Sequence, residues 1–277
     1  DYMLRRTKEG NLKGLPKKRI FVGVQGDNRE YLPLLAAEMS GEQLKTYETI
    51  IAEVKNAATE DKRKVVLPSL LKLKLASIHQ DLLLTSSFKD LSQNISKRAS
   101  LSSKVNSLLS LLKEIKQRQE KVLIFATSKS VQALVSVLIA HEFKILVETI
   151  NGETKAVSNN DSDETRKGII DKFQSQDGFG ILIMSPVAAG VGLTITGANN
   201  VIHLERHWNP AKEAQATDRV YRIGQKRDVN VYIPISLHPT QASFDVHLNN
   251  LLSNKIDLSD AVVAPEIVDS TDLAGLF

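Results

Sequence analysis

Two arginines near residue 220 have a spacing that could serve phosphate chemistry. Arg219 and Arg222 stand three positions apart at the end of a stretch with a helical pattern. On a helix such side chains project from one face, and two guanidinium groups there can grip a polyphosphate and neutralise charge as its terminal phosphate is transferred. Arginine suits this role because it is planar, bidentate and always charged. The alternative is a surface helix with two solvated arginines, because short motifs often arise by chance.

A second candidate segment is rich in small residues. Residues 185–194 include Gly190 and Gly192, which would let another backbone approach closely or let N–H groups reach a phosphate. A tight turn between a strand and a helix explains the same residues. The sequence has neither a Gly-x-x-x-x-Gly-Lys-Ser/Thr phosphate loop nor an Asp-Glu box for Mg²⁺. We therefore expect no complete ATP site in this chain.

The elements that must position these residues alternate from residue 121 onwards. Short apolar runs that predict buried strands are 122–125, 145–147, 181–184, 201–204 and 229–233. Helical stretches that separate several of them are 131–141, 165–174 and 211–221. This alternation predicts a parallel sheet with crossover helices, whose ligands bind at the carboxyl ends of the strands.

The first part of the chain has a different pattern of apolar and charged residues. Apolar residues recur at helical spacing from about residue 31 to residue 119. The first 120 residues hold 22 Lys and Arg against 14 Asp and Glu, although the net charge of the whole chain is only +4. This imbalance fits a polyanionic partner, although on charge alone a solvated helical surface is the favoured interpretation. Across the 277 residues, 42% are hydrophobic and none is cysteine, which predicts an ordinary core and excludes disulfides and thiolate metal sites. The start lacks both an initiator Met and an apolar signal region, so we expect a chain cut from something longer.

The arginine segment resembles a motif of a known family. Residues 215–225, Gln-Ala-Thr-Asp-Arg-Val-Tyr-Arg-Ile-Gly-Gln, closely resemble the last helicase motif of SWI/SNF-type ATPases, which are helicase-like translocases. Further segments resemble the family's other blocks in the same order: 2–8, 15–16, 103–104, 121–125, 151–152 with Arg166 and Phe173, 185–196, 207–210 and 243–255. The tryptophan block at 207–210 and the helical insertion before the sheet are typical of this family rather than of RNA helicases.

The resemblance implies roles for individual residues. It makes Arg219 and Arg222 arginine fingers, and it places Gly192 and Gln215 at the nucleotide. The residues placed where the family touches the DNA backbone are Thr127, Ser128, Gly152, Ser185, Ala189, Gly190 and Trp208. Such contacts position DNA without reading its sequence. For Trp208, packing of a loop onto the sheet remains the alternative.

The sequence departs from the family at several points. Asn151 and His207 stand where Asp is usual, and Thr194 stands where Asn is usual, which puts a contact at Thr194 in doubt. Residues 153–165 form a longer, acidic segment that we expect to be a surface loop. The sequence of residues 205–213 is similar to that of bacterial members of the family. Because such members occur in antiphage and repair settings, the resemblance implies defence as the expected pathway.

The resemblance also implies an architecture and a setting. It predicts a RecA-like parallel sheet flanked by helices at 101–242, a helical protrusion at 31–100, a C-terminal helical brace at 243–277, and the end of a first motor lobe with a linker at 1–30. ATP with Mg²⁺ would be bound mainly by that first lobe, so this chain alone is expected to be inactive. The implied partners are double-stranded DNA and the first lobe, with no membrane.

The implied location is the cytoplasm and nucleoid of a bacterium, or the nucleus in a eukaryote. A DNA- or protein-binding module that works without ATP is the competing interpretation. His203 and His207 have no carboxylate partner apparent in the sequence and are interpreted as structural, so no metal site is predicted.

Overall fold

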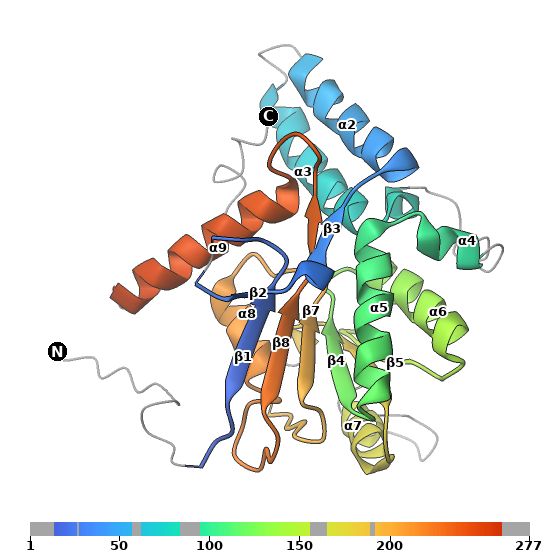
Figure 1. Cartoon of the computed structure of the whole chain (residues 1–277), viewed down its shortest axis with the longest axis vertical. Helices are drawn as coiled ribbons and strands as arrows, with labels where there is room; N and C mark the ends of the chain where they lie inside the picture. The colour runs from blue at the N-terminus through green and yellow to red at the C-terminus, as the bar shows by residue number, and fades with distance from the viewer. Residues whose placement is uncertain are drawn as a thin grey trace.

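A parallel sheet forms the centre of the fold. The computed structural model describes residues 14–26, 28–56, 62–83, 95–155, 165–188 and 192–261. Its seven-stranded sheet has the order β2-β1-β8-β7-β4-β6-β5, and all neighbouring strands in it run parallel (Figure 1). The strands are β1 (Lys18–Val22), β2 (Glu30–Tyr31), β4 (Lys121–Phe125), β5 (Glu148–Ile150), β6 (Gly180–Met184), β7 (Asn200–His203) and β8 (Val229–Ile233). The predicted parallel sheet flanked by helices is therefore confirmed.

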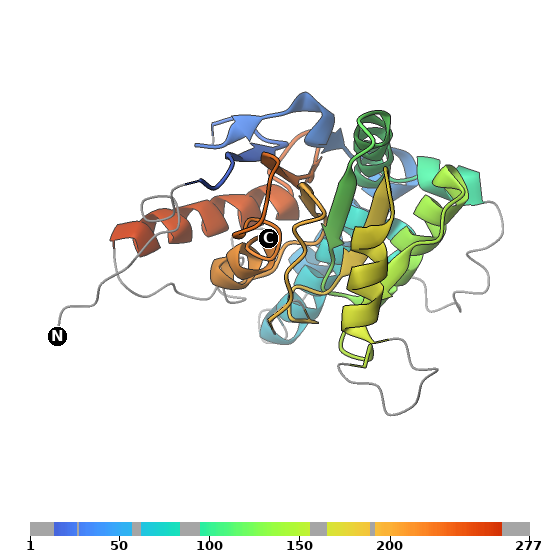
Figure 2. The ribbon, with the colours of Figure 1, turned by 90° about the horizontal axis from the view of Figure 1, so that it is seen from below.

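Helices cover both faces of this sheet. Helices α5 (Ser103–Gln117) and α6 (Lys129–Phe143) pack on one face, and α7 (Arg166–Ser175) and α8 (Pro210–Thr217) pack on the other. Figure 2, seen from below, has α5 and α8 on opposite sides of the strands. All five residues of β4 are buried because successive side chains enter the two cores in turn. Burial on both faces explains the continuous apolar runs in the sequence.

A helical protrusion stands at the carboxyl end of the sheet, at the top of Figure 1. It contains α2 (Gly41–Asn56), α3 (Lys62–Ile78), η2 (Gln80–Leu83) and α4 (Ile95–Ser100). Helix α9 (Phe244–Ala261) shares a third apolar cluster with α2 and α3. At its centre the buried hydroxyl of Tyr47 accepts a hydrogen bond from the Phe244 N–H at 2.7 Å. This bond ties the start of α9 to the protrusion.

Strand β1 is an element that the sequence did not predict. It pairs with β8 along its whole length, from Lys18 opposite Val229 to Val22 opposite Ile233. Farther along, β3 (Ala36–Glu38) pairs with β9 (Ile235–Leu237) in a separate two-stranded sheet. The sheet therefore uses residues from before the protrusion as well as after it, and the protrusion is an insertion within the sheet.

The chain passes very close to itself at the end of β1. A Cβ atom built on Gly23 would lie 2.1 Å from the carbonyl oxygen of Leu35, far inside contact distance. Only glycine leaves room for this approach. The Leu32 N–H donates to the carbonyl of Val22 at 3.0 Å, which holds the returning segment in place.

Three predicted boundaries are wrong. The strand expected at 145–147 begins at Glu148, because Lys144 ends α6 in the left-handed conformation, with φ 56°, and Leu146 is 76% exposed. The helix expected at 211–221 ends at Thr217, and the carbonyl of Arg219 accepts a hydrogen bond from the distant Ile195 N–H. The helical pattern expected from residue 31 begins only at Gly41, after the short strands β2 and β3. No helix in the described ranges is both long and apolar enough to span a bilayer.

Candidate functional site

The loop between β4 and α6 is held by a carboxylate from a neighbouring strand. Thr127 and Ser128 follow β4, and Glu205 follows β7, so the parallel pairing of these strands brings the three residues together. Glu205 accepts hydrogen bonds from the N–H groups of Thr127 and Ser128 at 2.8 and 2.7 Å, and from the Ser128 hydroxyl at 2.7 Å. The N–H groups of both residues and the Ser128 hydroxyl are thus engaged within the chain, whereas the Thr127 hydroxyl contacts another partner.

That partner is Lys74, which comes from α3 in the protrusion. Its ammonium lies 2.9 Å from a carboxylate oxygen of Glu205 and 3.3 Å from the hydroxyl of Thr127. It also lies 5.6 Å from the centre of the Trp208 ring, within range of a cation–π interaction. Burial alone would raise the pKa of Glu205, but the charge of Lys74 and the donors of the loop outweigh it and lower that pKa. Neither Lys74 nor Glu205 was predicted as a site residue from the sequence.

Trp208 makes contacts that fit both interpretations of it. Its ring meets Phe244 edge to face, with centroids 5.8 Å apart and an angle of 74°. It borders the apolar cluster of the protrusion and α9, yet it is only half-buried. One part of the indole therefore packs the loop, and another part remains accessible at the surface.

Gly152 and Ser185 lie after β5 and β6, beyond the same ends of the sheet. The Ser185 N–H donates to the carbonyl of Ile150 at 2.9 Å, which continues the strand pairing into the loop. Gly152 is exposed, and a Cβ atom there would meet nothing within 4 Å. Ala189 and Gly190 lie outside the described residues. The other predicted DNA-facing residues all follow the carboxyl ends of β4, β5, β6 and β7.

The two arginines lie in the turn that follows α8. Their predicted position on one helical face is wrong, because α8 ends at Thr217. Arg219 is 9% exposed, whereas Arg222 is exposed. The buried side-chain amide of Gln225 donates to the carbonyl of Ala198 at 2.7 Å, and the backbone N–H of Gln225 donates to the carbonyl of Arg222 at 2.9 Å. These bonds fix the turn against the segment before β7.

The two residues expected at the nucleotide are both accessible. Gly192 is exposed and has φ +61°, in the left-handed region that favours glycine, with open space where a Cβ would stand. Gln215 is exposed on α8. Among the described residues, no group of three His, Cys, Asp or Glu side chains is placed to hold a metal ion.

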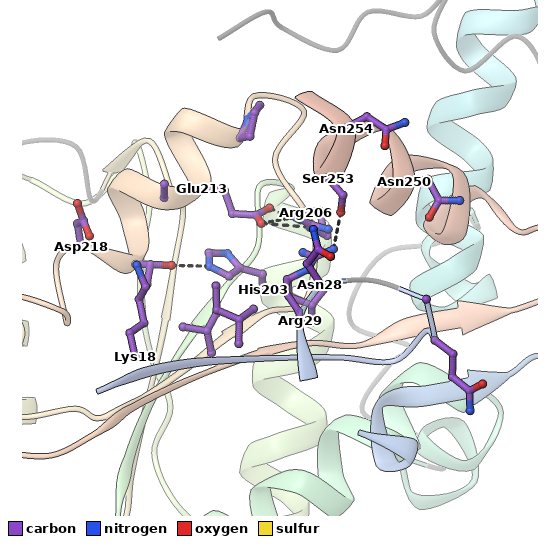
Figure 3. Close-up of a pocket in the computed structure, with 18 residues that line it drawn as sticks. Lys18, Asn28, Arg29, His203, Arg206, Glu213, Asp218, Asn250, Ser253 and Asn254 are labelled. Carbon is purple, nitrogen blue, oxygen red and sulfur yellow. Dashed lines mark hydrogen bonds and ion pairs between the residues drawn. The ribbon is translucent and has the colours of Figure 1, made fainter. Parts of the chain in front are cut away.

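A cavity of about 630 Å³ lies between β1, β8, α8 and α9 (Figure 3). None of the described site residues lines it. On its wall Arg206 grips Glu213 through two nitrogens, with the shortest contact at 2.6 Å, and both side chains are buried. Arg206 and Arg29 both donate to Asn249 on α9, each at 2.9 Å. This network joins the end of β7, α8, α9 and the segment before β2.

Two titrating groups beside the cavity have strongly shifted pKa values. Burial alone would raise the pKa of Glu213, but the adjacent Arg206 lowers it to about 2. Burial lowers the pKa of His203 to about 4. The Nε2 atom of His203 lies 2.8 Å from the Thr217 hydroxyl, and its ring stacks on Phe125 with centroids 5.3 Å apart. These contacts give His203 a place in the core of the sheet.

Comparison with known proteins agrees with this geometry. Residues 103–224 match the helicase conserved C-terminal domain. Zorya protein ZorD of Escherichia coli O139:H28 (strain E24377A / ETEC) is 36% identical over 259 residues, which cover 91% of this chain and 22% of that protein. The putative ATP-dependent helicase/translocase YwqA of Bacillus subtilis (strain 168) is 33% identical over 271 residues, or 96% of this chain and 26% of that protein. The chain thus spans about a quarter of the length of these relatives.

A solved structure extends the comparison to three dimensions. The Sulfolobus solfataricus SWI2/SNF2 ATPase core in complex with double-stranded DNA matches with a TM-score of 0.62 and 28% identity, over 94% of this chain and 49% of that one. The order of motifs, the parallel sheet and these similarities agree with one another. The chain therefore belongs to the SWI/SNF-type ATPases as a C-terminal helicase lobe.

Proposed function

We propose that this chain is the C-terminal motor lobe of an ATP-dependent translocase of double-stranded DNA. The observation that carries the proposal is that Thr127, Ser128, Gly152, Ser185 and Trp208 all follow the carboxyl ends of neighbouring parallel strands, where ligands of such sheets bind. The Sulfolobus core of the same fold was solved with double-stranded DNA, which supports duplex DNA as the ligand of this edge.

The second part of the proposal concerns ATP. The sequence has no phosphate loop and no Asp-Glu box, so ATP and Mg²⁺ would be held by a first lobe. Arg219 and Arg222 would act on the γ-phosphate from this side, with Gly192 and Gln215 beside them. An arginine finger works mainly when negative charge develops in the transition state. The name of YwqA, a putative ATP-dependent helicase/translocase, supports the same activity here.

The test uses a protein in which this chain is joined to its first lobe. Arg219→Ala and Arg222→Ala should each reduce DNA-stimulated ATP hydrolysis by roughly 10³–10⁵. Arg222→Lys should be nearly as damaging, because one ammonium cannot reproduce a bidentate fork. DNA affinity without nucleotide should stay almost unchanged in these variants, because the DNA-facing residues lie in other loops. Steady-state turnover and duplex binding are measured side by side.

Trp208→Ala is the contrasting variant, and it should keep ATP binding while losing the stimulation by DNA. The 277-residue chain alone should hydrolyse no ATP above background. If both arginine variants keep near-normal turnover, the assignment of Arg219 and Arg222 as catalytic residues is wrong even though the fold is right. A joined protein that binds duplex DNA but shows no DNA-stimulated turnover would instead favour the DNA-binding module that works without ATP.

A further inference from the structure

The contact between the protrusion and the DNA-facing edge of the sheet passes through one buried lysine. Lys74 is 7% exposed, and it lies on α3 more than fifty residues before the loop that it contacts. Its ammonium meets Glu205, Thr127 and Trp208, which are all at or next to the predicted DNA contacts. A buried ammonium is costly unless it is paired, so its position is closely determined by these three partners.

Glu205 transmits that position to the loop. One of its oxygens accepts both backbone N–H groups of Thr127 and Ser128, and the other accepts the Ser128 hydroxyl and lies 2.9 Å from Lys74. Within the described residues, the donors to this carboxylate therefore come from the loop or from Lys74. Because Glu205 takes up both N–H groups and the Ser128 hydroxyl, the Thr127 hydroxyl, which accepts from Lys74, is the group of this loop that can donate to a DNA phosphate.

We propose that Lys74 is a positioning residue for DNA binding, which acts through Glu205 to hold the Thr127–Ser128 loop and the Trp208 ring in one arrangement. This inference rests on the proposed function, because it assumes that the carboxyl edge of the sheet binds duplex DNA. It gives the protrusion a role in that binding: α3 braces two DNA-facing segments that come from different strands. Lys74 itself does not contact the DNA in this arrangement.

The 277-residue chain allows a direct test because Trp208 is its only tryptophan. The variant that carries both Lys74→Met and Glu205→Gln removes the two charges together, so no buried charge remains unpaired and the chain keeps its fold. Binding of a fluorescently labelled 30-base-pair duplex is measured by anisotropy, and Trp208 emission is recorded with and without saturating unlabelled duplex.

The expected result is a loss of binding with the fold intact. The double variant should bind duplex about tenfold more weakly, the effect of one lost charge-assisted hydrogen bond. The change in Trp208 emission on adding DNA should largely disappear. Lys74→Arg alone keeps a positive charge beside Glu205 and should therefore keep most of both signals. The matched control is the exposed pair Lys113 and Glu142, 2.8 Å apart on α5 and α6, and Lys113→Met with Glu142→Gln should behave like the wild-type chain.

Two results would overturn the inference without touching the proposed function. One is a double variant that binds DNA and changes Trp208 emission as the wild-type chain does. The other is a salt dependence whose logarithmic slope falls by about one in the double variant, because that would make Lys74 a direct phosphate contact. A wild-type chain that binds no duplex at all refutes the proposed function, and this inference with it.

Discussion

The ion pair of Arg206 and Glu213 shows how strongly this lobe depends on single buried charges. Both side chains are almost fully buried, and Arg206 contacts Glu213 through two nitrogens while a third donates to Asn249. A buried pair of this kind adds little stability over an apolar pair, but removing one partner leaves a costly unpaired charge. His203 lies close enough for the charge of Glu213 to influence its pKa. The wall of the cavity is therefore sensitive to protonation.

The first prediction at the residue scale concerns acid. The folded chain keeps His203 neutral because burial lowers its pKa to about 4 from an ordinary value of 6.5. An unfolded chain takes up this proton below pH 6.5, so stability from His203 is present above pH 6.5 and is lost as the pH falls towards 4. The full loss amounts to roughly 3 kcal/mol. Urea unfolding followed by Trp208 fluorescence at pH 7.0, 5.5 and 4.5 measures it.

His203→Asn is the variant that isolates this effect. It removes the titrating ring and should make the free energy of unfolding depend less on pH between 6.5 and 4. Glu213, with its pKa near 2, stays ionised in the folded chain over that interval, and its contribution is lost only below about pH 4.5. Identical pH profiles for the variant and the wild-type chain would contradict the assignment.

The sequence pointed to some of the residues at this edge of the sheet and not to others, for a physical reason. The family resemblance named Thr127, Ser128 and Trp208, and all three follow predicted strands, whose carboxyl ends meet at one edge of a parallel sheet. Lys74 looks like any solvated lysine on a helix, and Glu205 looks like the end of a strand. Their pairing depends on how α3 docks against the sheet, which no local pattern in the sequence reports.

At the scale of elements, the crossing beside β1 is the tightest point in the described fold that glycine makes possible. Gly23→Ala should destabilise the chain by at least 3 kcal/mol or prevent folding, because the added methyl group would lie 2.1 Å from a backbone oxygen of Leu35. Denaturant unfolding and the yield of soluble chain measure this effect. Gly152→Ala is the control, since open space surrounds that position. Equal stability of the two variants would show that the crossing can relax.

The same elements explain which parts of the fold could be predicted. Strands β4, β6, β7 and β8 are buried runs of apolar residues and were located to within a residue or so. Strand β1 carries two basic residues among its five and is only partly buried, so it lacks that pattern. The predicted helix was extended to residue 221 because Val220 and Tyr221 continue the helical spacing of apolar residues. Both side chains are buried, but they lie in the turn after α8 and not on the helix.

At the scale of the whole molecule, the prediction is weak binding to duplex DNA without sequence preference. A few contacts to phosphates imply dissociation constants on the order of 10⁻⁴–10⁻⁶ M at physiological salt for the 277-residue chain. Raising the salt concentration from 50 to 200 mM should weaken binding steeply, because each neutralised phosphate releases counterions. Anisotropy titrations with two duplexes of unrelated sequence test both statements. An affinity that does not change with salt concentration, or a much higher affinity for one of the two duplexes, would contradict them.

The parallel pairing of β1 with β8 also sets an order of events during synthesis. The Lys17 N–H bonds to the side chain of Asp228 across 211 positions, and β1 pairs with β8 next to this bond. At about 5–20 residues per second, a ribosome that has made β1 needs roughly 10–40 s more before β8 exists. We therefore expect β1 to join the sheet late. In refolding of the complete chain the same long separation must be closed, so pulsed hydrogen exchange should protect the amides of β1 after those of β4 and β6. Until then an unpaired strand edge stays open to association with other chains, so the growing polypeptide is a natural client for chaperones.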